Sequence, residues 1–327
     1  GRGDWLRAKR GACTLFQLKH ARHTRSAGEV GLGAYWLGFR KLLAAPMSRQ
    51  IILVDCPDAV GLVHTITGVL GERRLNIETN QEFVDAASGH FFFRAEVTAA
   101  DGNLPAGELQ AALAAVLPAA ASVRVTRESR RPIVVCATRE PHCLGELLLL
   151  DAIGELPGRI VGVVSNHDLL RGLVGRFGVP FAHVPHEGIT ARKKKWPLAA
   201  AIDAHAAEFV VLARYMRILS PEFVARYAGR MINIHHSFLP AFAGAAPYRQ
   251  AFERGVKLIG ATAHFVTAEL DDGPIIAQDV IPVDHTFTPE RMARAGSDVE
   301  KLVLARAVRL VLEERVFVHG RRTIVMG

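Results

Sequence analysis

The sequence is poor in the features that mark membrane, disulfide-rich and zinc-binding proteins. It has four cysteines in 327 residues, without Cys-x-x-Cys or paired spacing. That pattern argues against a disulfide framework and a cysteine zinc site, and it favours a reducing, cytoplasmic location. No uninterrupted apolar run approaches the roughly 18 residues that a membrane span needs, so we expect no membrane association. A chain of this length with 50% hydrophobic residues can bury more than one core, which predicts two domains.

The positive charge is concentrated at the N-terminus. The formal net charge is +8, but residues 1–46 contain nine Lys/Arg and two acids, so residues 47–327 carry only +1. This near-neutral body predicts no nucleic-acid partner. Residues 1–46 lack a clear apolar period and stop just before Met47. We expect them to be disordered or a non-native extension from an over-extended reading frame; a transit peptide is the alternative.

Residues 48–128 are predicted to form a small domain with the order β-α-β-β-α-β, a ferredoxin-like α/β arrangement. The turn Asp58-Ala-Val-Gly61-Leu62 places a glycine at the start of its first helix, and His64 is expected on that helix's surface. No nucleophile, ligand cluster or phosphate loop is evident in this region. The predicted strands are 50–55, 76–84, 90–97 and 122–126, and the predicted helices are 63–72 and 108–117.

Residues 131–327 are predicted to form a larger catalytic domain after a charged linker, Arg127–Pro132. Strongly apolar strands alternate with helical stretches, a pattern typical of a doubly wound, mostly parallel, Rossmann-like sheet. Ligands bind such sheets beyond the carboxyl ends of the strands. The predicted strands are 133–137, 160–165, 181–184, 209–213 and 231–235, followed by a hairpin (258–266 and 274–283), a helix (289–314) and a closing hairpin around His319-Gly320.

The strongest candidate for chemistry is the end of the strand Met231–His235. Residues two apart on a strand point the same way, so Asn233 and His235 share a face. An amide can donate a hydrogen bond to an oxyanion, and an imidazole can donate or accept a proton. The acidic turn Asp271-Asp272-Gly273 offers a carboxylate that would orient or deprotonate water. The alternative is a strand-end histidine with satisfied hydrogen bonds and an ordinary turn.

Other candidate sites are weaker. The loop 138–145 lacks both G-x-G-x-x-G and the P-loop pattern, which disfavours dinucleotide or nucleoside-triphosphate binding. His142 and Cys143 lie near a helix start, where the dipole would lower a thiol pKa; a packed helix end is favoured, and a catalytic cysteine is the alternative. The run Arg192–Lys195 is interpreted as a solvated loop, with attraction of a polyanionic substrate tail as the alternative. We expect no metal site, because no helical i, i+4 histidine pair occurs among His235, His236, His264, Asp271 and Asp272.

Four motifs of the second domain are Asn233-Ile-His235, Ser237-Phe-Leu-Pro240, Gly260–Val266 and Leu270–Ile276. Taken together, they resemble the folate-dependent formyltransferases. The Asp-x-x-Gly-Leu turn of region 48–128 resembles that of an ACT domain. Further motifs are His142-Cys143-Leu144, Ser165-Asn166-His167, Leu212–Met216 and Val318-His319-Gly320. With the ACT-like region, they make the chain similar, over residues 48–327, to the formyltetrahydrofolate deformylase family of that superfamily.

The resemblance implies hydrolysis of 10-formyltetrahydrofolate to formate and tetrahydrofolate, without metal or cofactor. It implies catalytic roles for Asn233, His235 and Asp271, the last preferred over Asp272 because it lies seven residues after His264. It further implies a homo-oligomer, an amino-acid effector at the ACT domain, and formate supply for one-carbon and purine metabolism. The implied substrate residues are Met216, Arg217, Ile218, Leu219, His264, Thr267 and Ala268, and the implied regulatory residues are Asp58, Gly61 and Leu62.

The chain departs from the family pattern at Ala246 and Arg249, where family members commonly carry a basic residue and a histidine. The nearest alternative function is formyl transfer to an amine such as glycinamide ribonucleotide. Transferases of that kind resemble this chain except for a glycine-rich phosphate loop, where this sequence has Arg139–His142. Glu140 would repel a phosphate, so hydrolysis is favoured. A folate or amino-acid sensor without turnover is the alternative from another class.

Overall fold

The computed structural model describes residues 49–99, 105–185, 197–241 and 247–327. The predictions for residues 1–46, Arg192–Lys195 and Ala246 fall outside these residues. From residue 47 onward the chain forms one compact unit. Among the described residues, no helix combines the length and the apolar character needed to cross a membrane.

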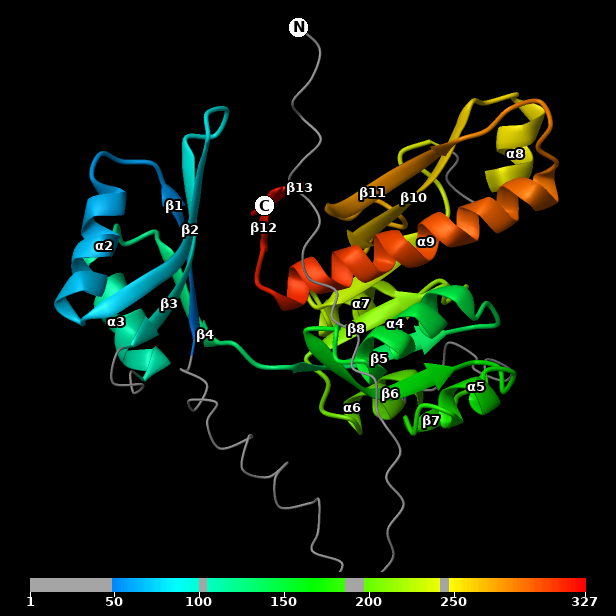
Figure 1. Cartoon of the computed structure of the whole chain (residues 1–327), viewed down its shortest axis with the longest axis horizontal. Coiled ribbons are helices and arrows are strands. Elements are labelled where there is room, and N and C mark those ends of the chain that lie inside the picture. Colours follow the sequence, from blue (N-terminus) through cyan, green and yellow to red (C-terminus); the bar gives the residue numbers. More distant parts are fainter. Residues whose placement is uncertain (1–48, 100–104, 186–196, 242–246) are drawn as a thin grey trace, which may run out of the picture. The chain divides into compact units, whose positions relative to one another are not determined.

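The first domain has the predicted order of elements, and its four strands form one antiparallel sheet in the order β2-β3-β1-β4 (Figure 1). Alternate side chains of β1 pack into two different apolar clusters. Ile52, Val54 and Cys56 pack with the helices, whereas Ile51 and Leu53 lie in a separate apolar cluster. The elements are β1 (Gln50–Pro57), α2 (Leu62–Glu72), β2 (Leu75–Asp85), β3 (His90–Ala99), α3 (Ala106–Val116) and β4 (Ser122–Arg127).

The C-terminal hairpin packs on the ACT-like sheet. Strands β12 (Val316–His319) and β13 (Arg322–Val325) form this hairpin, and Phe317 and Met326 share an apolar cluster with the outward side chains of β1. The buried guanidinium of Arg94 on β3 donates to the backbone carbonyls of Glu313 and Glu314 at 2.8 and 2.9 Å. The end of the second domain is therefore bonded to the first.

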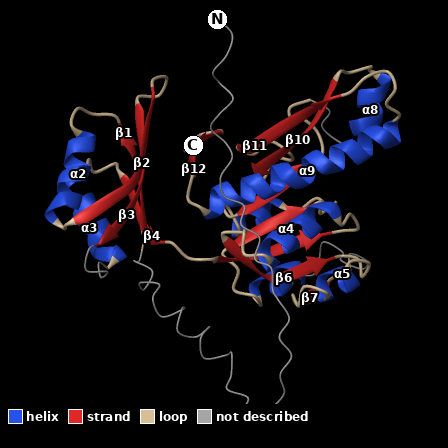
Figure 2. Ribbon diagram, in the orientation of Figure 1, coloured by secondary structure: helices blue, strands red, loops and turns tan. Residues whose placement is uncertain are grey.

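The second domain is built on a seven-stranded sheet with the order β11-β10-β9-β8-β5-β6-β7. Figure 2 shows the strands in red and the helices in blue. The five strands from β9 to β7 are parallel, and β10 runs antiparallel to both of its neighbours, β9 and β11. This confirms the predicted doubly wound, mostly parallel fold. The strands are β5 (Arg131–Ala137), β6 (Gly158–Ser165), β7 (Phe181–His183), β8 (Phe209–Ala213), β9 (Met231–His235), β10 (Leu258–Phe265) and β11 (Ile275–Pro282).

Helices cover both faces of this sheet. Helices α4 and α9 contribute to the apolar core on one face, and α6 and α7 contribute to the core on the other. The chain leaves β5 toward β6 on one side, whereas β8 pairs with β5 on the other, so the order of strands reverses between β5 and β8. The helices are α4 (His142–Ala152), α5 (Arg171–Gly175), α6 (Pro197–Asp203), α7 (Pro221–Arg226), α8 (Pro247–Glu253) and α9 (Pro289–Leu312).

The linker is shorter than the sequence predicted. Strand β5 already includes Arg131 and Pro132, so only residues 128–130 connect the two sheets. Proline is tolerated there because it lies near the start of the strand, and its carbonyl still accepts a hydrogen bond from Glu208 N–H at 2.8 Å.

Candidate active site

Strands β9 and β10 bring the predicted catalytic residues together. In their antiparallel register, His264 lies opposite Asn233 and Thr262 lies opposite His235. His235 is 5% exposed and ends β9, at the edge where parallel sheets bind ligands. The apolar neighbours Ile232 and Ile234 pack in the main core, so the strand is fixed from its other face.

His235 and Asp271 form a hydrogen-bonded pair. Nδ1 of His235 lies 3.3 Å from Oδ2 of Asp271, and this bond holds the pKa of the Asp271 carboxyl below its usual range, although burial opposes the effect. The carboxylate accepts, so Nδ1 carries the hydrogen. Nε2 of His235 is buried without a hydrogen-bond partner. Leaving such an atom without a hydrogen bond is costly, so Nε2 is a candidate for contact with a ligand.

Asn233 is oriented by His264. Its Nδ2 lies 3.2 Å from Nε2 of His264, whose Nδ1 lies 2.8 Å from the carbonyl oxygen of Phe265. A carbonyl only accepts, so Nδ1 carries the hydrogen and Nε2 accepts from the amide. Burial lowers the pKa of His264, which favours this neutral ring. One amide hydrogen of Asn233 is thus anchored, and the other is available to an oxyanion.

The loop that carries Asp271 has a constrained backbone. Asp271 adopts a left-handed φ of +55°. Two residues on, Gly273 passes so close to the Phe265 carbonyl that a Cβ there would collide with backbone. Asp272 instead points away to an exposed ion pair with Arg321. The geometry therefore separates the two acids, and it is Asp271 that faces His235.

The segment after β9 is held by buried hydrogen bonds. Thr262 Oγ1 donates to the carbonyl of Ser237 at 2.9 Å and accepts from the N–H of Leu239 at 3.0 Å. Gln278 on β11 donates to the same hydroxyl and to the carbonyl of Leu239. Two antiparallel strands therefore fix the turn that follows His235.

The predicted substrate segment Met216–Leu219 follows β8. Its first N–H donates to Thr138 Oγ1, at the end of β5, at 3.0 Å, and Arg217 N–H donates to Tyr215 O at 2.8 Å. Contacts from these two residues to a substrate would therefore use carbonyls or side chains. The side chain of Ile218 is 80% exposed. Thr267 is half-buried and Ala268 exposed. Tyr215, Leu219 and Val266 pack against one apolar cluster, which brings the two loops to the same part of the domain.

The predicted regulatory residues form the start of α2. Gly61 has φ +90° and precedes the helix, so its left-handed backbone explains the glycine. Leu62 is buried, and Asp58 N–H donates to Gly89 O at 2.8 Å. His64 is exposed, as predicted. Nothing in this geometry identifies an effector, so the regulatory role stays a prediction.

A second polar group, which we call the Glu300 cluster, was missed by the sequence analysis. Glu300 on α9 is 1% exposed. Its Oε2 lies 2.8 Å from His142 Nε2 and 3.4 Å from Arg214 Nε, and its Oε1 accepts from the Tyr248 hydroxyl at 2.7 Å. Burial acts to raise the pKa of Glu300, but these partners outweigh it and lower the pKa. The available signal was an acid on the apolar stripe of α9, four residues before buried Leu304.

Cys143 lies beside this cluster as a packed residue. It is fully buried, and burial raises the pKa of its thiol, so the thiolate-forming alternative is wrong and the packed helix end is confirmed. His142, Cys143 and Glu300 place potential metal-ligand atoms within 4.8 Å of one another. The guanidinium of Arg214 already supplies a positive charge to Glu300, which makes a cation unfavourable there.

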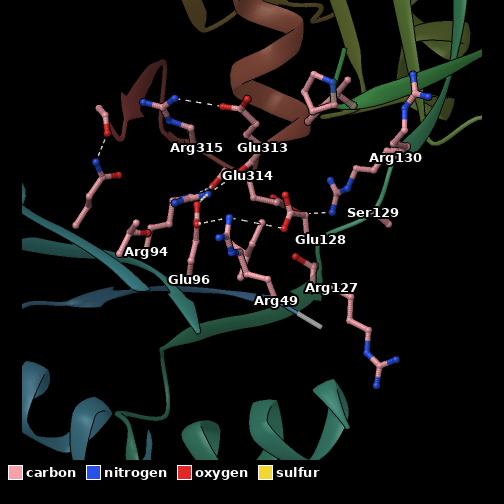
Figure 3. A pocket seen from close by; sticks show the side chains of 18 residues that line it. Arg49, Arg94, Glu96, Arg127, Glu128, Ser129, Arg130, Glu313, Glu314 and Arg315 are labelled. Carbon is pink, nitrogen blue, oxygen red and sulfur yellow. Dashed lines mark hydrogen bonds and ion pairs between the residues drawn. The ribbon is translucent and has the colours of Figure 1, made fainter. Parts of the chain in front are cut away.

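A cavity of about 710 Å³ lies elsewhere (Figure 3). It is bordered by β1, β3, the linker and the end of α9, and it contains none of the residues predicted to act on the substrate. Its arginines and glutamates are largely engaged with each other, as in Arg94–Glu96 at 2.8 Å and Arg49–Glu96 at 3.3 Å. This cavity therefore belongs to the contact between the two domains.

The two departures from the family pattern are Arg249 and Ala246. Arg249 on α8 has a 76% exposed side chain and pairs with Glu253 at 3.2 Å, so it points away from His235. Ala246 lies outside the described residues.

Comparison with known families finds one family match for each of the two domains. The Formyl transferase family matches residues 131–308, and the ACT domain family matches residues 50–115. A formyltetrahydrofolate deformylase of Escherichia coli is 52% identical over 280 residues, covering 86% of this chain and 99% of the relative.

Solved structures separate two kinds of relative. The crystal structure of a formyltetrahydrofolate deformylase from Pseudomonas syringae matches with a TM-score of 0.82 and 40% identity, covering 90% of this chain and 99% of that one. Glycinamide ribonucleotide transformylase 1 from Symbiobacterium toebii matches with a TM-score of 0.58 and 34% identity, covering 61% of this chain and 95% of that one. The transformylase therefore shares only part of the chain.

Proposed function

The chain belongs to the formyltetrahydrofolate deformylase family, and we propose that it hydrolyses 10-formyltetrahydrofolate to formate and tetrahydrofolate with Asn233, His235 and Asp271. The observation that carries the assignment of residues is the buried, unpartnered Nε2 of His235, whose other nitrogen is bonded to Asp271. A binding protein without turnover has no need of a polarised imidazole and an ionised carboxylate at one point.

The proposed reaction begins with water beside the His235–Asp271 pair. The water oxygen bonds to the formyl carbon, and the pair takes the proton that the water loses. As the carbon–nitrogen bond breaks, the pair returns a proton to N10 of the folate, which leaves tetrahydrofolate and formic acid, and the acid releases its remaining proton to solvent to become formate. The lowered pKa of Asp271 keeps its carboxylate charged, so it stabilises His235 whenever the imidazole carries the proton.

Asn233 is the proposed oxyanion donor. Its free amide hydrogen would bond the formyl oxygen as negative charge develops, a contribution of roughly 3 kcal/mol in comparable sites. His264 is 2% exposed and both of its nitrogens have protein partners, so we propose that it serves the substrate by orienting Asn233. The pterin is proposed to lie between Met216–Leu219 and the loop that carries Thr267 and Ala268.

The remaining family properties are proposals of the same kind. We propose an ACT domain over residues 48–128 and a catalytic domain over 131–327, an amino-acid effector at Asp58, Gly61 and Leu62, and a homo-oligomer. We further propose that the reaction uses no metal or cofactor, that it occurs in the cytoplasm, and that its formate supplies one-carbon and purine metabolism. The three described cysteines, all free and buried, are compatible with a reducing compartment.

Formate release from 10-formyltetrahydrofolate by the full chain, with and without glycinamide ribonucleotide, tests the proposal. We expect formate at the same rate in both cases. Formyl transfer that needs the amine would move the protein to the transferase class. Folate binding without either product would leave a sensor.

A further inference from the structure

The Glu300 cluster joins four separate parts of the chain around one buried carboxylate. His142 comes from the start of α4, Arg214 from the loop after β8, Tyr248 from α8 and Glu300 from α9. The sequence makes room for it: a Cβ at Gly296, one turn before Glu300, would collide with the Tyr248 hydroxyl. Arg214 adopts a left-handed φ of +60°, which a residue other than glycine rarely does without support from its surroundings.

The cluster lies where the topology predicts a ligand. In doubly wound sheets, ligands occupy the crevice beyond the carboxyl ends of the two strands between which the order reverses. Here those strands are β5 and β8. His142 follows the end of β5, Arg214 follows the end of β8 directly, and the two meet on Glu300. Side chains of the protein itself therefore occupy part of this crevice.

The occupied part of the crevice borders the proposed reaction site. The ring of His236 lies 5.1 Å from that of His235 and 6.2 Å from that of Tyr248, so one imidazole separates the cluster from the catalytic pair. A nucleophile carried on a larger molecule needs space for its body beside the formyl group. Water needs no such space.

We propose that the Glu300 cluster determines specificity by occupying the space that an amine substrate would need, so that water alone reaches the formyl carbon. This inference rests on the proposed hydrolase function. The same fold occurs in the glycinamide ribonucleotide transformylase described above, so the sheet itself does not prevent formyl transfer. We therefore attribute the difference between hydrolysis and formyl transfer to the side chains at the edge of the sheet.

A purely stabilising role explains the cluster less well. Buried ion pairs are weak contributors to stability, because desolvation of the charges offsets their attraction. Two guanidinium nitrogens of Arg214, Nε and Nη1, are buried without a hydrogen bond, although Nε lies 3.4 Å from Glu300. Apolar residues of similar size would fill the same volume without leaving these donors unbonded.

The test measures how the formyl group divides between water and an added amine. In transfer, the amine nitrogen bonds to the formyl carbon, the bond from carbon to N10 breaks, and a proton passes from the amine to N10. We would assay formate and the formylated amine together, with glycinamide and with glycinamide ribonucleotide, in the wild type, His142→Ala and Tyr248→Ala. Because both products come from the same active molecules, their ratio does not depend on how much of a variant is folded.

We expect the ratio of formylated amine to formate to rise at least about tenfold in both variants. His183→Ala is the matched control, because His183 ends β7 at the same sheet edge and lies outside the cluster. An unchanged ratio in both cluster variants, or an equal rise in His183→Ala, would overturn the proposal. A wild type that releases no formate contradicts the proposed function instead, so the two failures are distinct.

Discussion

The two buried carboxylates of the catalytic domain, Asp271 and Glu300, differ in how completely they are bonded. The side chain of Asp271 is 16% exposed and has one hydrogen-bond partner, His235 at 3.3 Å; the accepting Nε2 of His264 lies 3.9 Å away and does not donate to it. Glu300 is 1% exposed and has His142, Tyr248 and Arg214 on its two oxygens. One acid has bonding capacity left, and the other has little.

In the proposed mechanism this difference separates a reacting group, Asp271, from a group that shapes the space beside it, Glu300. An active site must leave polar atoms unpaired for the substrate and transition state, as His235 Nε2 is here. A carboxylate that already accepts several donors has nothing to offer an incoming water. Loss of Asp271 should therefore affect turnover, whereas loss of Glu300 should affect folding and selectivity.

The largest effect is expected for Asp271→Asn. An amide cannot take a proton from water or stabilise a charged His235, so kcat should fall by about 10³-fold. The change is nearly isosteric, and the amide oxygen can still accept the hydrogen bond from Nδ1 of His235, so folate affinity and the unfolding free energy should change little. Formate release measures kcat, and titration of tetrahydrofolate by fluorescence measures folate affinity.

Asp272→Asn is the matched control for this comparison. Asp272 is the next residue, but it pairs with exposed Arg321, and such pairs contribute little. We expect less than about a twofold change in kcat. If Asp272→Asn were the inactive variant, the assignment of the catalytic acid would be wrong.

The fold was largely predictable because its patterns are local. Alternating and continuous apolar runs located the strands, and no end of a strand or helix that was predicted with bounds moved by more than two residues. Asn233 and His235 were found because strand periodicity sets their shared face. The linker was overextended because Pro132 was interpreted as a strand breaker, although the start of a strand accepts it.

The Glu300 cluster was not predictable because its members are distant in sequence. His142 and Glu300 are 158 residues apart, and no periodicity relates them. Glu300 stands between Val299 and Lys301 on a long amphipathic helix, where an acid resembles a surface residue. The pairing depends on how α4 and α9 pack on the same face of the sheet, which is a property of tertiary structure.

The next largest effect is expected for Glu300→Gln. Removing the negative charge leaves Arg214 buried without its counter-charge, so the unfolding free energy should fall by about 3 kcal/mol. Urea denaturation followed by circular dichroism measures this. Asp298→Asn, an exposed acid on the same helix paired with Lys301, is the control and should cost less than about 0.5 kcal/mol. Equal losses of unfolding free energy in Glu300→Gln and Asp298→Asn would show that buried Glu300 stabilises the fold no more than an exposed acid does. That result would contradict the role in folding that distinguishes Glu300 from Asp271.

The smallest effect concerns His236, which lies between the two carboxylates. Burial, helped by the charge of Arg214 and by His235, lowers the pKa of His236 to about 4, although Glu300 and Asp271 act to raise it. Tyr248 also borders the ring.

Between the unfolded pKa near 6.5 and the folded value of about 4, the unfolded chain binds a proton that the folded chain does not. Stability contributed by neutral His236 is therefore complete above pH 6.5 and is lost on acidification toward pH 4. Between pH 7 and 5 the wild type should lose about 2 kcal/mol through this group, and His236→Gln should be spared that loss. His64→Gln on exposed α2 should retain the wild-type dependence. If His236→Gln also retains the wild-type pH dependence, His236 does not lose its proton on folding. Asp271 and Glu300 would then together offset the effect of burial and hold His236 charged in the folded chain.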